Sequence, residues 1–170
     1  FAAPIVQTSP VQAELAKIWT NILRYTQFAL PNLLMINCEQ YSANVFEVIE
    51  LINHDYPRGG MAQPGLTAGT CLRKDFAFSE ERSSAPGMLL AVSRVNESVP
   101  LFLVEGIRRR LGTLRERKVA VLGLAFKGDT DDERDSLSHK LIRMLERELA
   151  DVVAHDPVVA TPTAGFEEAV

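Results

Sequence analysis

The sequence predicts an α-rich chain of the α+β class, in which a helical part precedes the first strand–helix–strand unit of a doubly wound sheet. Two observations support this prediction. Over residues 10–113, apolar side chains recur every three or four positions, which is the period of amphipathic helices. From Lys118 the pattern becomes a short apolar run, a helical segment and a second short run, which is typical of a parallel sheet with a crossover helix. We therefore expect two units, 10–113 and 117–170.

Composition places the chain among ordinary globular proteins. Of its 170 residues, 46% are apolar and 24% are charged, and the net charge is −4, so neither disorder nor a nucleic-acid partner is expected. No apolar run reaches the ~20 residues that a membrane span needs, and the first ten residues lack the basic start of a signal peptide. We expect a cytoplasmic protein with no membrane partner and no metal site, in which Cys38 and Cys71 are free thiols.

The first predicted element is a long helix that begins at Ser9-Pro10. Serine is a preferred capping residue, and proline suits the first helical position. Pro31 is expected to kink or interrupt this helix, because it lacks a backbone N–H. The apolar face before Pro31 consists of Leu15, Ile18, Ile22 and Tyr25.

Two further helices are predicted around a loop rich in glycine and proline. Ser42 is placed to cap a helix over residues 45–52, and the loop then runs over residues 57–69. Residues 86–111 have a helical pattern again, and Gly112 is placed to end that helix.

The second unit begins with residues 119–122, which are continuously apolar, as in a strand buried on both faces of a parallel sheet. Residues 134–149 form an amphipathic helix, and Val152 starts a second strand that ends at Asp156. Asp156 could bind a ribose or simply close an Asp-Pro turn. Since two strands are not a stable sheet alone, we expect the remaining strands outside this sequence or pairing with another element.

The stretch around Cys71 is the most informative for chemistry. Small residues precede the cysteine, and Lys74-Asp75 follow it. If a helix starts near Cys71, the helix dipole and free backbone amides favour the reactive thiolate, and Asp75 lies on the same face one turn later. The alternative is a buried structural cysteine in a tight turn, which is how we interpret Cys38 in its apolar setting.

Two other segments carry candidate binding groups. Glu14, Lys17 and Asn21 share a helix face, on which Lys17 and Asn21 could stabilise an oxyanion; a solvated Glu–Lys pair is the simpler alternative. Residues 123–136 follow a strand, where doubly wound sheets bind nucleotides. They lack G-x-G-x-x-G, so no dinucleotide is implied. Lys127 could pair with a phosphate, or the stretch is an acidic connection.

In their order and spacing, these segments resemble the UDP-glucose/GDP-mannose 6-dehydrogenase family. The shared motifs are Lys17-x-x-x-Asn21, a Gly-rich loop ending in Cys-x-x-Lys-Asp at Asp75, a Leu-Gly-x-Ala-Phe-Lys turn ending at Lys127, and Arg-Val-Asn-Glu at residues 94–97. The resemblance implies a central helical dimerisation domain with the catalytic cysteine loop over 10–113. It also implies the start of a Rossmann-like UDP-binding domain over 117–170, with the family's N-terminal NAD-binding domain absent from this sequence.

The resemblance implies a role for each motif. Family enzymes use NAD to oxidise the C6 alcohol of a nucleotide-linked sugar to a carboxylate, a reaction of polysaccharide biosynthesis. Cys71 would be the nucleophile, carrying a thiohemiacetal and then a thioester. Lys17 and Asn21 would stabilise the oxyanion or position water, and Asp75 would assist proton transfer.

Two further residues match substrate contacts of the family. Lys127 matches the UDP-sugar contact, and Arg58 matches an arginine that members offer to the sugar site of the partner subunit in a homodimer. NAD would be held by the absent domain, so the chain alone is expected to be inactive.

Departures from the family pattern bear on the sugar. The usual Gly-Gly-x-Cys is Ala68-Gly69-Thr70-Cys71 here, and Arg73 replaces the proline often found before Lys-Asp. The result is closer to members that act on N-acetylated UDP-hexosamines. The rival interpretation is a non-catalytic dimerisation module derived from the family. A thiol-dependent hydrolase is not favoured, because no histidine lies near Cys71 in the sequence: the three are His54, His139 and His155.

Overall fold

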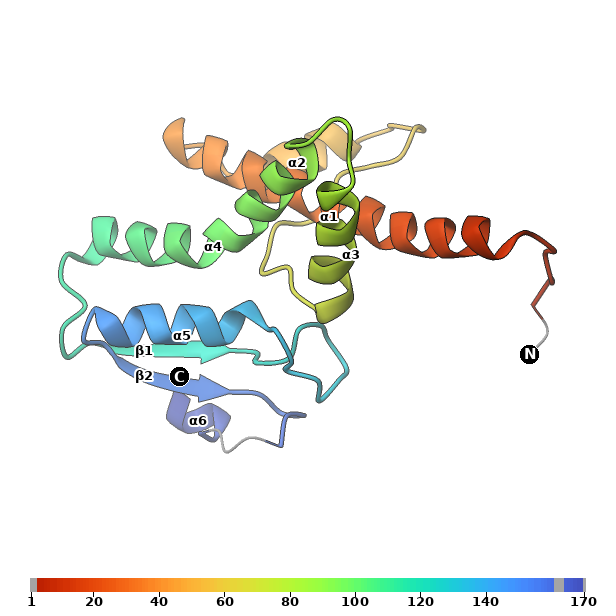
Figure 1. Cartoon of the computed structure of the whole chain (residues 1–170). Coiled ribbons are helices and arrows are strands. Elements are labelled where there is room, and N and C mark those ends of the chain that lie inside the picture. The colour runs from red at the N-terminus through yellow and green to blue at the C-terminus, as the bar shows by residue number, and fades with distance from the viewer. Residues whose placement is uncertain (1–2, 161–163, 170) are drawn as a thin grey trace.

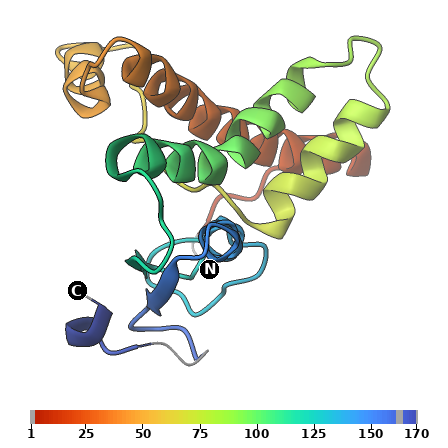
Figure 2. The same ribbon diagram turned by 90° about the vertical axis from the view of Figure 1, so that its left-hand side faces the viewer.

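The computed structural model describes residues 3–160 and 164–169, and it has a helical layer above a small sheet (Figures 1 and 2). The elements in order are α1 (Pro10–Gln40), α2 (Val45–Asn53), α3 (Thr70–Glu81), α4 (Met88–Leu111), β1 (Lys118–Leu122), α5 (Leu137–Arg147), β2 (Asp151–His155) and α6 (Phe166–Ala169). Helices α1 to α4 form the upper layer, α5 lies between it and the strands, and α6 lies beyond β2. The predicted helical unit followed by a strand–helix–strand unit is confirmed.

Helix α1 begins where the sequence predicts and runs further than expected. The Ser9 hydroxyl accepts a hydrogen bond from the Gln12 N–H, and the Gln12 side chain accepts one from the Ser9 N–H, which completes a capping box. Pro31 does not interrupt the helix, because packing against α4 holds this buried segment in place of the one missing hydrogen bond. Although α1 has 31 residues, neither it nor any other described helix is long and apolar enough to cross a membrane.

Three other helices begin at residues that differ from the prediction, and in two of them a side-chain cap sets the start. Asn44, not Ser42, caps α2, because the Asn44 Oδ1 accepts from the Phe46 N–H at 3.0 Å. Helix α4 starts two residues late, after Gly87 at a φ of 113°. Helix α5 starts only after Ser136, whose hydroxyl accepts from the Ser138 N–H at 3.3 Å. Gly112 ends α4 as predicted, at a φ of 76°.

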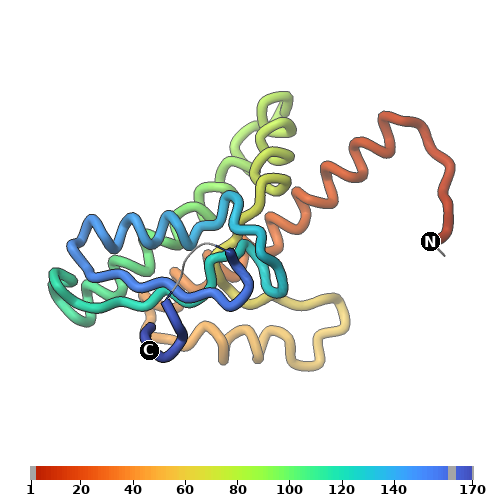
Figure 3. Tube along the Cα trace, turned by 90° about the horizontal axis from the view of Figure 1, so that it is seen from below, coloured from red at the N-terminus to blue at the C-terminus, as the bar shows by residue number. Residues whose placement is uncertain are grey.

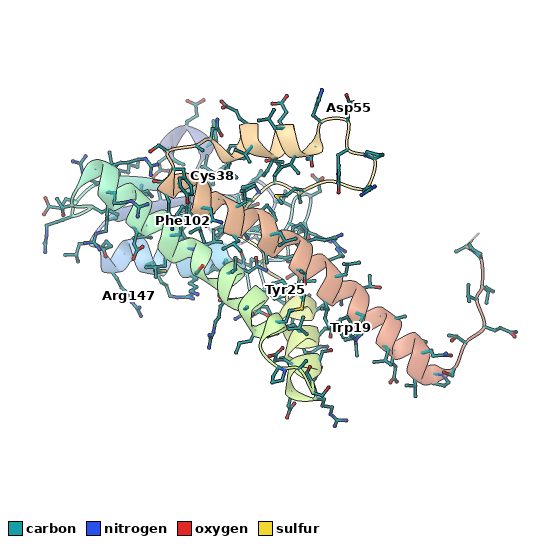
Figure 4. All side chains as sticks on the ribbon, turned by 90° about the horizontal axis from the view of Figure 1, so that it is seen from above. Trp19, Tyr25, Cys38, Asp55, Phe102 and Arg147 are labelled. Atoms are coloured by element: carbon teal, nitrogen blue, oxygen red, sulfur yellow. The ribbon has the colours of Figure 1, made fainter. Side chains whose placement is uncertain are left out.

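A buried pair of amide side chains joins α1 to α4, near where Tyr25 lies at their crossing (Figure 4). The Asn32 Nδ2 donates to the Asn96 Oδ1 at 2.9 Å, and the Asn96 Nδ2 donates to the Tyr25 carbonyl at 3.2 Å. The Asn32 Oδ1 in turn accepts from the Gly65 N–H at 2.8 Å. Both amides are fully buried and paired, so they hold the loop that leads to Cys71 at Gly65.

The two strands form a parallel pair, with Lys118 opposite Asp151 and Leu122 opposite His155. A shared core joins this sheet to the helical layer through α4, β1 and α5; its buried members are Val104, Leu114, Val121 and Leu145. The prediction that β1 is buried on both faces is wrong. Only Val121 of β1 is buried, and Leu122 is 56% exposed, because α5 covers one face of a sheet that has two strands among the described residues.

Asp156 ties the end of β2 to the turn after β1. One carboxylate oxygen accepts from the N–H groups of Leu124 and Ala125 at 2.8 and 3.1 Å. The other accepts from the N–H groups of Val158 and Val159 at 2.9 and 3.1 Å. The hydrogen bonds from Val158 and Leu124 hold the pKa of Asp156 well below its usual range. Of the two sequence-based alternatives, the carboxylate therefore has the turn-closing role here.

Candidate active site

Cys71 lies in the first turn of α3, the placement on which the reactive-cysteine hypothesis depends, and it is exposed, unlike a buried structural cysteine. The helix begins at Thr70, after Gly69 at a φ of 113°, a conformation that favours glycine. Gly69 supplies no side-chain cap, so the first backbone N–H groups and the positive end of the helix dipole act on a sulfur at this place. Cys38, by contrast, is buried in the cluster between α1 and α2, which confirms its interpretation as a core residue.

One helical turn after Cys71, the Asp75 carboxylate joins α3 to α1. The Lys17 Nζ lies 2.8 Å from the Asp75 Oδ2, and the Asn21 Nδ2 donates to the same oxygen at 2.6 Å. The side chain of Asp75 is only 3% exposed, whereas that of Lys17 is 59% exposed. The predicted face of α1 is thus brought to the predicted face of α3, with a buried carboxylate between two donors.

The electrostatics of this group keep both ions charged. Burial alone would raise the pKa of Asp75, but the hydrogen bonds from Lys17 and Asn21 outweigh it, so the pKa lies below its ordinary value. The hydrogen bond to Asp75 raises the pKa of Lys17. The Lys17 ammonium has further N–H donors for a ligand.

The turn after β1 packs against the loop before Cys71. The ring of Phe126 lies 3.4 Å from the place where a Cβ on Gly69 would be. Lys127 follows, with its Nζ 5.4 Å from the centre of the Phe126 ring. Between this turn, α1 and the loop is a cavity of about 230 Å³. Its wall includes Arg24 and Phe28 of α1, Leu72 of α3 and the loop residues Gly65–Ala68, besides Phe126 and Lys127.

A second set of contacts holds the start of α3 to the α4–α5 side of the molecule. The Thr70 hydroxyl donates to Asp135 at 2.8 Å, and an Arg73 Nη1 lies 3.4 Å from the same carboxylate. Arg73 also pairs with Glu97 of α4 at 3.0 Å, and Lys140 of α5 donates to the Glu97 carbonyl at 2.7 Å. Arg73, the departure from the family's proline, is therefore an ion-pairing residue between α3, α4 and the strand–helix connection.

Arg58 lies apart from these groups. It lines a different groove, of about 680 Å³, between α1, the end of α2 and the following loop. Phe28 lines both this groove and the cavity beside Lys127. The structure thus brings Lys17, Asn21 and Asp75 together beside Cys71 but leaves Arg58 on another surface of the same chain.

Two site residues are not among those that the sequence patterns single out. Arg24 stands seven positions after Lys17, on the same helical face, so spacing alone could have identified it. Asp135 contacts Thr70 across 65 positions, and no local pattern carries that information.

Two family models match the chain. One, described as the central domain of the UDP-glucose/GDP-mannose dehydrogenase family, matches residues 11–98, and the UDP binding domain of the same family matches residues 120–168. UDP-N-acetyl-D-mannosamine dehydrogenase of Pyrococcus horikoshii is 33% identical over an alignment of 172 positions, covering 98% of this chain and 41% of that protein. UDP-glucose 6-dehydrogenase of Haloferax volcanii is 36% identical over 162 positions, covering 91% and 37%.

A solved structure matches in the same way. The UDP-N-acetyl-mannosamine dehydrogenase from P. horikoshii superimposes with a TM-score of 0.84 at 33% identity, covering 99% of this chain and 42% of that one. The chain therefore spans about two fifths of the length of such relatives, between 37% and 41% in the two named above. Because the central-domain model covers just over half of the residues, and the UDP-binding model follows in the expected order, the chain belongs to the UDP-glucose/GDP-mannose dehydrogenase family.

Proposed function

We propose that these residues belong to an NAD-dependent nucleotide-sugar 6-dehydrogenase that oxidises the C6 alcohol of a UDP-hexose or UDP-N-acetylhexosamine to a carboxylate. The supporting observation is that Cys71, the Lys17–Asn21–Asp75 group and the turn carrying Lys127 converge on one place. Relatives named for UDP-N-acetyl-D-mannosamine and UDP-glucose support the substrate class. The Ala-Gly-Thr-Cys sequence favours the N-acetylated sugars.

The two units would have different roles in this function. Residues 10–113 would be the helical dimerisation domain with the catalytic cysteine loop, and residues 117–170 part of the UDP-sugar-binding domain. Lys127 would contact the UDP-sugar. Arg58, on its separate groove, would reach the sugar site of the partner subunit.

In this proposal, the Cys71 sulfur adds to the aldehyde carbon at the intermediate stage, and an oxyanion forms on the former carbonyl oxygen. The Lys17 ammonium and the Asn21 amide are the donors that would stabilise it. Water later attacks the Cys71 thioester, which releases the carboxylate and the thiol. Because its pKa is lowered, Asp75 is a poor proton acceptor at neutral pH, so we assign it the orientation of Lys17 and Asn21 in place of proton transfer.

NAD would accept the hydride in both oxidations. The sequence contains no G-x-G-x-x-G, and its residues therefore do not fit a dinucleotide. The steps assigned to this chain are accordingly those of substrate binding, nucleophilic addition and hydrolysis alone.

The purified 170-residue chain is expected to reduce no NAD with any UDP-sugar, whereas the complete protein that contains it should do so. The reason is that hydride transfer needs a site that positions the nicotinamide. The measurement is NADH formation with UDP-glucose and UDP-N-acetylmannosamine, for both proteins. Turnover by the isolated chain would contradict the expectation, and an inactive complete protein would favour the non-catalytic dimerisation module.

We also propose that the chain is a homodimer through its central helices. The N-terminal part of α1 projects from the body (Figure 3), and Trp19 lies on it (Figure 4). One face of α1 exposes five large apolar side chains by 44–58%: Leu15, Trp19, Leu23, Leu30 and Leu33. Such a continuous apolar stripe marks an interaction surface.

Light scattering at micromolar concentration should therefore give the mass of a dimer, and Leu23→Asp should shift it toward the monomer because it places a charge in the stripe. Thr20→Asp, exposed on another side of α1, is the matched control and should leave the mass unchanged. A wild-type chain that is strictly monomeric would refute the dimer.

A further inference from the structure

The first turn of α3, which carries Cys71, is held by polar contacts with other elements. Asp75 is the one buried residue of this helix, all of which the structure describes, and it joins the end of the turn to α1. At the start of the turn, the Thr70 hydroxyl donates to the Asp135 Oδ2 at 2.8 Å, and the Arg73 Nη1 lies 3.4 Å from the Asp135 Oδ1. The two oxygens of one carboxylate therefore contact residues on either side of the cysteine.

The start of α3 is held less well by its own groups than the starts of other helices. Gly69 gives it no side-chain cap, whereas Ser9 and Asn44 cap α1 and α2. Its first backbone hydrogen bond, from the Arg73 N–H to the Gly69 carbonyl, is 3.4 Å long, against 2.9–3.1 Å for the corresponding bonds of α1, α2 and α4. Because helix ends fray when such groups are poorly paired, the Asp135 carboxylate supplies a restraint that the helix itself lacks.

Asp135 has a backbone conformation that few residues adopt. Its φ is 56°, in the left-handed region, which aspartate tolerates better than most residues with a side chain. Contacts on both sides hold it there: the Asp132 carboxylate pairs with the Arg134 guanidinium at 2.7 Å, and the Ser136 N–H donates to the Glu133 carbonyl at 3.1 Å. The carboxylate therefore contacts α3 from a turn whose backbone is itself held in place.

The ion pair between Arg73 and Asp135 contributes little to the stability of the whole chain. The two side chains are 40% and 42% exposed, and exposed ion pairs of this kind are weak. The consequence of the contacts made by Asp135 is therefore local. The turn that they restrain is the one that contains Cys71.

We propose that Asp135 is a positioning residue for Cys71, acting through Thr70 and Arg73 to keep the first turn of α3 helical. This inference rests on the proposed function and adds a residue of the β1–α5 connection to it. A helical first turn presents free N–H groups that favour a thiolate within it, and a frayed turn does not. The charge of Asp135 has the opposite effect, because a nearby carboxylate disfavours a second anion. Positioning and charge therefore predict opposite results when Asp135 is replaced.

The test is alkylation of the 170-residue chain by iodoacetamide as a function of pH, with Cys71 and the buried Cys38 distinguished by peptide mapping. In Asp135→Gly, the midpoint of Cys71 alkylation should move upward by about 0.2–0.7 in pH, the equivalent of a lost helix-terminus interaction. Glycine adopts a φ of 56° freely, so the substitution adds no backbone strain. Asp129→Gly, exposed on the same connection and with the same φ, is the matched control and should keep the wild-type midpoint.

Two further variants separate the hydrogen bond from the charge. Thr70→Val removes the donor to Asp135 and changes no charge, so it should move the midpoint upward as Asp135→Gly does. Asp135→Asn keeps an acceptor for the Thr70 hydroxyl and removes the charge, so its midpoint should equal the wild-type value or lie slightly below it. Far-UV circular dichroism should be the same for all these proteins.

An unchanged midpoint in either Asp135→Gly or Thr70→Val would overturn the proposal. A downward shift in Asp135→Gly would do so too, because it would give the residue an electrostatic role only. A midpoint in Asp135→Asn as high as that of Asp135→Gly would show that the hydrogen bond to Thr70 is not what matters. Because alkylation requires neither NAD nor a nucleotide sugar, the result is separate from the turnover assay of the complete protein.

Discussion

Replacing Asp156 by alanine is expected to lower the free energy of unfolding of the chain by about 3 kcal/mol or more. Its carboxylate accepts four backbone hydrogen bonds, two from the turn after β1 and two from the segment after β2. Hydrogen bonds to a charged group contribute about 1.5–3 kcal/mol each, although not additively. Losing them leaves the N–H groups of the buried residues Leu124 and Val159 without this acceptor.

That loss is a large share of the ~5–15 kcal/mol that stabilises a typical domain. Urea denaturation followed by circular dichroism would measure it. Asp151→Ala, at the exposed start of β2, is the matched control and should stay within about 0.5 kcal/mol of the wild type. An equal loss of unfolding free energy in Asp156→Ala and Asp151→Ala would show that the four hydrogen bonds do not contribute the expected stability.

The same residue predicts the response to acid. The folded-state pKa of Asp156 is depressed, so its stabilising contribution is present above the unfolded pKa of ~3.9 and is lost as the pH falls through the folded value. Between pH 7 and pH 3 the wild type should therefore lose more stability than Asp156→Ala. Identical losses in the two proteins would contradict this assignment.

Periodicity predicts the order and type of the elements well, because each apolar face is repeated many times within a helix. It does not predict where helices begin. Asn44 caps α2 instead of Ser42, and Ser136 delays α5 past the predicted residue 134, because a cap depends on one hydrogen bond and not on a repeated pattern. A local pattern also does not predict how far β1 is buried, because the same apolar run occurs in strands that are covered on one face and in strands that are covered on both.

The candidate site, like the fold, is predicted by the sequence only in part. The spacing of Lys17 and Asn21 predicts one shared face, and helix spacing places Asp75 on the face of Cys71. The contact between the two faces joins residues 58 and 54 positions apart, and no local pattern predicts it. The pair Asn32–Asn96, 64 positions apart, holds the loop before Cys71 and has no signature in either local sequence. Long-range polar contacts of this kind are set by how helices cross, which no single segment determines.

In the complete enzyme, Cys71→Ser is expected to stop turnover after the aldehyde stage and to slow carboxylate formation by at least about 10³-fold. A thiol is nucleophilic enough to add to the aldehyde with little assistance, whereas a serine hydroxyl needs a dedicated general base. The oxygen ester that serine would form also arises less readily than a thioester and hydrolyses more slowly.

The neighbouring groups cannot supply that base. Asp75 has a lowered pKa and Lys17 a raised one, so at neutral pH the first is too weak a base and the second is already protonated. Lys17→Ala should behave differently, slowing both stages without changing which intermediate accumulates, because it removes a donor and leaves the nucleophile. Single-turnover kinetics with trapping of the intermediate distinguishes the two variants. Carboxylate formation by Cys71→Ser at a near wild-type rate would make Cys71 a structural residue at the start of α3, and the nucleophile would have to be sought elsewhere.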